Sequence, residues 1–107
     1  MFEISVEEVK RKLDAGEPVH LIDVREAEEL EICRLDGAEH IPMMSLFTGI
    51  QQTEAPADAC IVVFCHLGIR SREAAHYLRL NGHPNALSMT GGVTAWSHRV
   101  DPTLPTY

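Results

Sequence analysis

Residues 65–71 place a nucleophile, a glycine and an arginine within one short stretch, and they could carry chemistry. In order they are Cys65, His66, Leu67, Gly68, Ile69, Arg70 and Ser71. A loop that curls onto the N-terminus of a helix aims several backbone N–H groups inward, which creates an anion-binding nest. A cysteine in such a nest is stabilised as its thiolate. We therefore predict that Cys65 is a nucleophile and that residues 66–71 bind its substrate.

Three residues of this loop have separate expected tasks. Gly68 permits a backbone turn that other residues resist. Arg70 adds a fixed positive charge and a donor fork suited to an oxyanion. Ser71 is expected to cap the helix that follows.

The residue types of the loop also indicate which of the reactions open to a thiolate it could support. Acyl transfer usually needs a histidine base held by a third group, and His66 is a sequence neighbour whose side chain is not expected to face Cys65. Phosphoryl transfer needs a cradle around three equatorial oxygens. Sulfur transfer needs only attack on a sulfane sulfur, an anionic leaving group, and donors around the outer sulfur of the resulting persulfide. The loop fits sulfur transfer best.

The elements that must position this loop are those of an α/β fold. Residues 60–64 are continuously apolar, as is typical of a central parallel strand buried on both faces. The loop follows this strand directly, at the edge of the sheet where ligands bind in open α/β sheets. Further strands are predicted at residues 19–24, 38–41 and 85–88, and helices at residues 6–16, 26–33, 43–50, 71–80 and from 91–92 through Trp96. Ser5 and Glu8 predict an N-cap for the first helix.

Composition limits the class of protein. The chain has 107 residues, 45% of them hydrophobic, and a formal net charge of −7. We expect one domain spanning residues 1–107 with an irregular tail from about residue 99. The negative charge argues against nucleic-acid binding and against anionic membrane surfaces. We expect a cytoplasmic protein, since neither a signal peptide nor a membrane helix is evident.

The three cysteines form no C-x-x-C pair, so neither a disulfide framework nor a metal site is predicted. Cys33 is interpreted as a buried filler residue. We expect a monomer, because no long exposed apolar stripe is evident.

Four landmarks in this order resemble those of single-domain rhodaneses, the thiosulfate sulfurtransferase-like family. They are residues 21–26, residues 37–42, the Cys65 loop, and residues 91–96. The resemblance covers about residue 5 to residue 96. It implies a three-layer α/β domain around a parallel sheet, with no cofactor.

The resemblance also implies an activity and site residues. Sulfane sulfur would pass from thiosulfate or a persulfide donor, through a Cys65 persulfide, to cyanide, a thiol or a sulfur-carrier protein. Asp23 and Arg25 match positions that support the site. The small donor would be anionic, and a sulfur carrier or a cysteine desulfurase is a candidate protein partner. Residues 33–35 depart from the commonest family pattern and are similar to members fused to activating enzymes of cofactor biosynthesis, which favours a sulfur carrier.

Two other functions remain open at this level. A Cys-based phosphatase or arsenate reductase is disfavoured because four residues separate Cys65 from Arg70, whereas those enzymes resemble a pattern one residue longer. A non-catalytic interaction module is disfavoured because such modules usually lack the cysteine.

Overall fold

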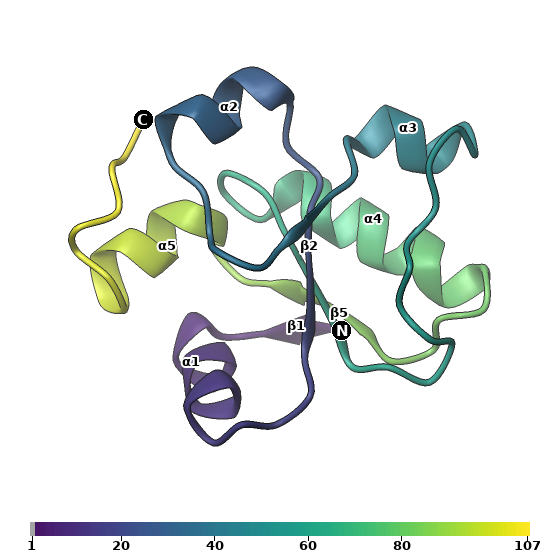
Figure 1. The fold of residues 1–107 in the computed structure, drawn as a ribbon, viewed down its shortest axis with the longest axis horizontal. Coiled ribbons are helices and arrows are strands. Elements are labelled where there is room, and N and C mark those ends of the chain that lie inside the picture. The colour runs from purple at the N-terminus through teal and green to yellow at the C-terminus, as the bar shows by residue number, and fades with distance from the viewer. Residues whose placement is uncertain (1) are drawn as a thin grey trace.

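A five-stranded parallel sheet forms the centre of the molecule in a computed structural model that describes residues 2–107 (Figure 1). The strands lie in the order β1-β5-β4-β2-β3. Their bounds are β1 Glu3–Ile4, β2 His20–Asp23, β3 Glu39–His40, β4 Ile61–Phe64 and β5 Ala86–Met89. All four residues of β4 are buried, as the uninterrupted apolar run predicted.

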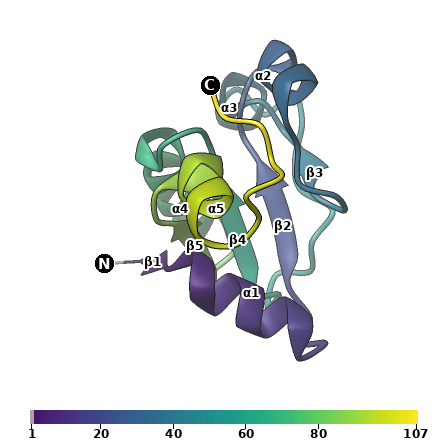
Figure 2. The same ribbon diagram turned by 90° about the vertical axis from the view of Figure 1, so that its left-hand side faces the viewer.

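Helices cover both faces of the sheet and complete the three layers. They are α1 Val6–Asp14, α2 Ala27–Ile32, α3 Met43–Phe47, α4 Ile69–Leu80 and α5 Gly92–Arg99. One apolar core lies under α3 and α4 and contains Val63 and Leu78. The second lies under α1 and α5 and contains Val62 and Trp96. Figures 1 and 2 show α2 at one end of the sheet, beside the end of the chain.

The predicted α/β fold and parallel sheet are confirmed, and the differences are local. The strand β1 was not predicted, because two residues are too few to show the alternation of apolar and polar side chains that marks a strand. It is held to β5 by two hydrogen bonds: Ser88 N donates to Phe2 O at 2.8 Å, and Thr90 N donates to Ile4 O at 2.9 Å. Ser5 caps α1 as predicted, with its Oγ accepting from Glu8 N at 3.1 Å. Helix α4 begins at Ile69, two residues earlier than predicted, with Gly68 as its N-cap.

The prediction for Cys33 as a buried residue is confirmed, since 5% of it is exposed. Among residues 2–107, no helix is long and apolar enough to cross a membrane. The irregular tail after α5 does not extend into solvent, because its end returns to α2 and to the Cys65 loop.

Candidate active site

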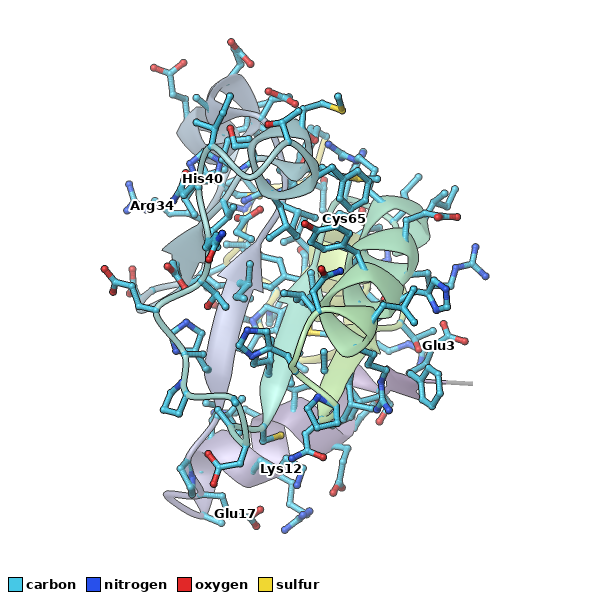
Figure 3. All side chains as sticks on the ribbon, turned by 90° about the vertical axis from the view of Figure 1, so that its right-hand side faces the viewer. Glu3, Lys12, Glu17, Arg34, His40 and Cys65 are labelled. Atoms are coloured by element: carbon cyan, nitrogen blue, oxygen red, sulfur yellow. The ribbon has the colours of Figure 1, made fainter. Side chains whose placement is uncertain are left out.

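Cys65 lies at the carboxyl end of β4, close to the N-terminus of α4, and is 1% exposed. Figure 3 shows it at the same end of the sheet as His40, far from Lys12 and Glu17 at the opposite end. Two backbone amides point at its sulfur: Gly68 N lies 3.1 Å and Ser71 N 3.4 Å from Sγ. The first-turn amides of a helix have no intrahelical acceptor, so they are free to stabilise a thiolate. The predicted nest is therefore present around Cys65.

Ser71 does not cap α4, contrary to the sequence-based prediction. Because the helix begins at Ile69, Ser71 stands inside its first turn, fully buried. Its Oγ lies 3.5 Å from Cys65 Sγ, 3.2 Å from the carbonyl oxygen of Gly68, and 2.7 Å from Ser88 Oγ on β5. Ser71 thus links the sulfur to the neighbouring strand through a hydroxyl chain.

Gly68 makes the turn of the loop possible. Its φ is +98°, and a Cβ there would lie 3.0 Å from the backbone nitrogen of Gly91. The left-handed conformation and the close backbone approach both require glycine. The sequence-based role of Gly68 agrees with this geometry.

The start of α5 holds the loop from the other side. Val93 N donates to the carbonyl oxygen of Cys65 at 2.9 Å, and Thr94 N donates to that of His66 at 3.2 Å. Gly92 allows this approach, since a Cβ on it would lie 2.3 Å from the Cys65 oxygen. The helix amides therefore fix the backbone of Cys65 itself.

The sequence predicted that Arg70 offers its guanidinium to an anion at the Cys65 loop, but the structure places this group elsewhere. Its Nη1 and Nη2 bind the two carboxylate oxygens of Glu29 on α2 at 2.7 and 2.8 Å. These hydrogen bonds to Glu29 are the main reason that the pKa of Arg70 is raised, with a smaller contribution from nearby Cys65. Arg70 is close to Cys65, but its charge is paired with that of Glu29.

Asp23 and Arg25 form a buried ion pair at the end of β2. Arg25 Nη2 lies 2.8 Å and Nε 3.0 Å from the Asp23 carboxylate, and the same guanidinium donates to the carbonyl oxygen of Cys33 at 2.8 Å. Neither residue is more than 2% exposed. Both were predicted to support the site, and here they tie β2 to the end of α2.

Tyr107 closes the network from the tail. Its ring stacks on His66 with centroids 3.8 Å apart, and its hydroxyl donates to Glu29 at 2.8 Å while accepting from Arg25 at 3.0 Å. Burial raises the pKa of Tyr107 to about 12, so the hydroxyl stays protonated. His66 is held by the tail, with its Nε2 2.7 Å from the Tyr107 carbonyl oxygen.

The remaining loop residues point outward. Leu67 is 54% and Ile69 63% exposed, so they form an apolar rim beside the nest. Within residues 2–107, no group of three or more His, Cys, Asp or Glu side chains is placed to hold a metal ion.

Sequence reasoning missed Glu29, Tyr107, Ser88 and Gly92 as parts of the site. Glu29 had a local signal, because it forms a capping box with Glu26, whose backbone N lies 2.9 Å from its carboxylate. The contacts of Tyr107 and Ser88 join distant parts of the chain and leave no local pattern. Gly92 was predicted only as the start of the last helix, within the landmark of residues 91–96, and not as a contact of the Cys65 loop.

A family model described as a rhodanese-like domain matches residues 5–99. The chain belongs to the rhodanese-like domain family. Its fold agrees with that of a rhodanese-like domain protein from Staphylococcus aureus, with a TM-score of 0.82 and 30% identity over 100% of this chain and 99% of that one. The human single-domain sulfurtransferase TSTD1 shares the fold at a TM-score of 0.82, with 24% identity over 92% of this chain and 97% of that one.

Curated relatives of this rhodanese-like domain are longer proteins. The probable adenylyltransferase/sulfurtransferase MoeZ of Mycobacterium tuberculosis is 34% identical over 97% of this chain and 26% of its own length. The adenylyltransferase and sulfurtransferase MOCS3 of Sus scrofa is 36% identical over 97% of this chain and 27% of its own length. The chain spans about a quarter of each.

The Glu29–Arg70 pair predicts a specific acid sensitivity. Hydrogen bonding from Arg70 lowers the pKa of Glu29 from its ordinary 4.5 to about 2. A depressed folded-state pKa stabilises the fold fully above pH 4.5, and this contribution is lost as the pH falls toward 2. With allowance for solvent screening of the partly exposed Arg70, it is on the order of 1–2 kcal/mol. Denaturant unfolding should therefore show wild type more stable than Glu29→Gln at pH 6, with the difference narrowing between pH 4.5 and 2. A pH-independent difference would contradict the assignment.

Proposed function

We propose that this rhodanese-like domain is a sulfurtransferase that carries a sulfane sulfur as a persulfide on Cys65. The donor is thiosulfate or a persulfide, and the acceptor is a thiophile such as cyanide, a thiol or a sulfur-carrier protein. The observation that carries the proposal is the pair of amides of Gly68 and Ser71 aimed at the Cys65 sulfur. Membership of the rhodanese-like family supports the same reaction.

Two steps return the enzyme to its starting state. The Cys65 thiolate attacks the outer sulfur of the donor, a new S–S bond forms, and the donor's own bond to that sulfur breaks. The leaving group, sulfite or a thiolate, departs with the bonding electron pair. In the second step the acceptor attacks the outer sulfur of the Cys65 persulfide and releases the thiolate, which the helix amides stabilise without reorganisation.

The geometry favours sulfur transfer over phosphoryl transfer or arsenate reduction. A phosphatase needs its arginine fork on the oxygens of the transferred group. Here both terminal nitrogens of Arg70 are bound to Glu29. The other hydrogen-bond donors at Cys65 are the backbone amides of Gly68 and Ser71, and both point at the single atom Sγ. This arrangement suits the transfer of one sulfur atom.

A sulfur carrier is the protein acceptor that we propose. The sequence relatives named adenylyltransferase and sulfurtransferase contain a segment that matches 97% of this chain. The apolar rim of Leu67 and Ile69 offers a contact surface beside the nucleophile.

The proposal is tested by the intact mass of the reduced protein before and after incubation with thiosulfate or a hydropersulfide. Wild type is expected to gain one sulfur atom and to lose it to cyanide as thiocyanate. Cys65→Ser should gain none, whereas Cys60→Ser, a control at the far end of β4, should behave as wild type. Release of phosphate from esters without any gain in mass would favour the phosphatase, and neither reaction would favour the interaction module.

A further inference from the structure

Charge around the Cys65 nest determines which donor can approach, and the structure shows this charge to be balanced. Arg70 is the arginine of the loop itself, and Glu29 binds both of its terminal nitrogens. The Glu29 carboxylate is itself fixed by Glu26 N at 2.9 Å and by the Tyr107 hydroxyl at 2.8 Å. Four hydrogen bonds therefore hold the carboxylate against Arg70.

The second guanidinium near the site is neutralised in the same way. Arg25 is fully buried and bonded to the carboxylate of Asp23 through Nε and Nη2. Its Nη1 donates to Tyr107 and to the backbone oxygen of Glu29. Arg25 consequently has no free donor for a ligand at Cys65.

The outer face of the loop is apolar at two positions. Leu67 and Ile69 are apolar and more than half exposed. Arg72 lines a groove of about 490 Å³ with Ile69, but Glu3 and Glu73 line the same groove. A sulfur donor that reaches Cys65 therefore meets two neutralised ion pairs and an apolar rim, on a protein of net charge −7.

We propose that Glu29, by pairing with Arg70, prevents this arginine from binding the sulfur donor. Cys65 therefore takes its sulfur from hydropersulfides with an uncharged body rather than from thiosulfate. This proposal rests on the proposed function. Thiosulfate brings two negative charges to a site whose loop arginine, Arg70, is already paired with Glu29, which costs binding energy. A hydropersulfide with an uncharged body brings at most one negative charge, so it meets less repulsion and can place its carbon atoms against Leu67 and Ile69.

The transfer from such a donor balances without any further reactant. The Cys65 thiolate attacks the terminal sulfur of R–S–SH, a new S–S bond forms on Cys65, and the S–S bond of the donor breaks. The thiolate R–S⁻ leaves with the electron pair, and the proton stays on the transferred sulfur. One negative charge is present before and after the step.

The deciding experiment compares two donors at Cys65: thiosulfate and the hydropersulfide of N-acetylcysteine amide, generated in situ. Wild type, Glu29→Gln and Glu28→Gln are assayed for kcat and KM with each. Glu28→Gln is the matched control, since it removes the same charge from an exposed position on the same helix. Glu29→Gln frees the charge of Arg70 and should lower the KM for thiosulfate about tenfold, the equivalent of 1.4 kcal/mol. The hydropersulfide KM should change much less than the thiosulfate KM, so the preference between the two donors shifts, and Glu28→Gln should match wild type.

The ionic strength dependence of the wild-type protein gives a second readout that does not depend on folding of the variant. Added salt screens repulsion between the nest and a dianion, so kcat/KM for thiosulfate should rise with salt while that for the hydropersulfide stays flat. A fall with salt would show a free cation attracting thiosulfate and would overturn the proposal. Equal changes in the KM values for both sulfur donors in Glu29→Gln would also overturn the proposal, since Glu29 would then be a positioning residue only. If neither donor adds sulfur to Cys65, the proposed function itself fails.

Discussion

Gly92→Ala is expected to reduce sulfur transfer by about 100-fold or more, the size of effect that a displacement of about 1 Å at a reacting group produces. A Cβ at this position would lie 2.3 Å from the carbonyl oxygen of Cys65 and 2.4 Å from that of His66. Both obstacles are backbone atoms, so no side-chain rotation relieves the overlap. The hydrogen bonds from Val93 N and Thr94 N to the same two oxygens must lengthen, and the nucleophile moves with them.

Steady-state thiocyanate formation and thermal unfolding should be measured together on this variant. Gly16→Ala is the matched control, because Gly16 has φ +71° against +58° for Gly92 and has no atom within 4 Å of the added Cβ. The control carries the backbone strain of about 1–2 kcal/mol without the steric overlap, so its activity should stay near wild type. Gly92→Ala with nearly full activity would show that the contact between α5 and the loop does not position Cys65.

The position of Cys65 at the end of a central strand could be predicted from the sequence because its determinants are local. A continuous apolar run ends at Cys65, and a glycine and a helix follow within a few residues. The family landmarks gave the order of elements, which the parallel sheet confirms. Local patterning also placed α1 and α4 to within one or two residues.

The electrostatics of the site could not be predicted, because they depend on pairs that are far apart in sequence. Arg70 and Glu29 are 41 residues apart, and Tyr107 and Glu29 are 78 apart. The sequence presented Arg70 as an anion-binding fork, and only the packing of α2 against the loop shows that its charge is paired. The same limit applies to Ser71, whose role changed once the start of α4 moved to Ile69.

Replacing Arg25 with methionine is expected to destabilise the fold by about 3–5 kcal/mol, the usual result when one partner of a buried ion pair is removed. Asp23 is 2% exposed and would keep its carboxylate without a counter-charge. The carbonyl oxygen of Cys33, which accepts from Arg25 at 2.8 Å, would also lose its donor. Denaturant unfolding measures the loss, and Arg34→Met, at an exposed position, should change stability by less than about 0.5 kcal/mol.

The double variant Asp23→Leu/Arg25→Met separates the cost of an unpaired charge from the value of the pair. If the unpaired carboxylate causes the loss, the double variant should recover part of the stability that Arg25→Met alone lacks. Its activity should nevertheless stay low, because Arg25 also donates to the hydroxyl of Tyr107, whose ring stacks on His66 in the Cys65 loop. Recovery of both stability and activity would contradict a supporting role for Arg25. A loss below about 1 kcal/mol in Arg25→Met would contradict the buried ion pair itself.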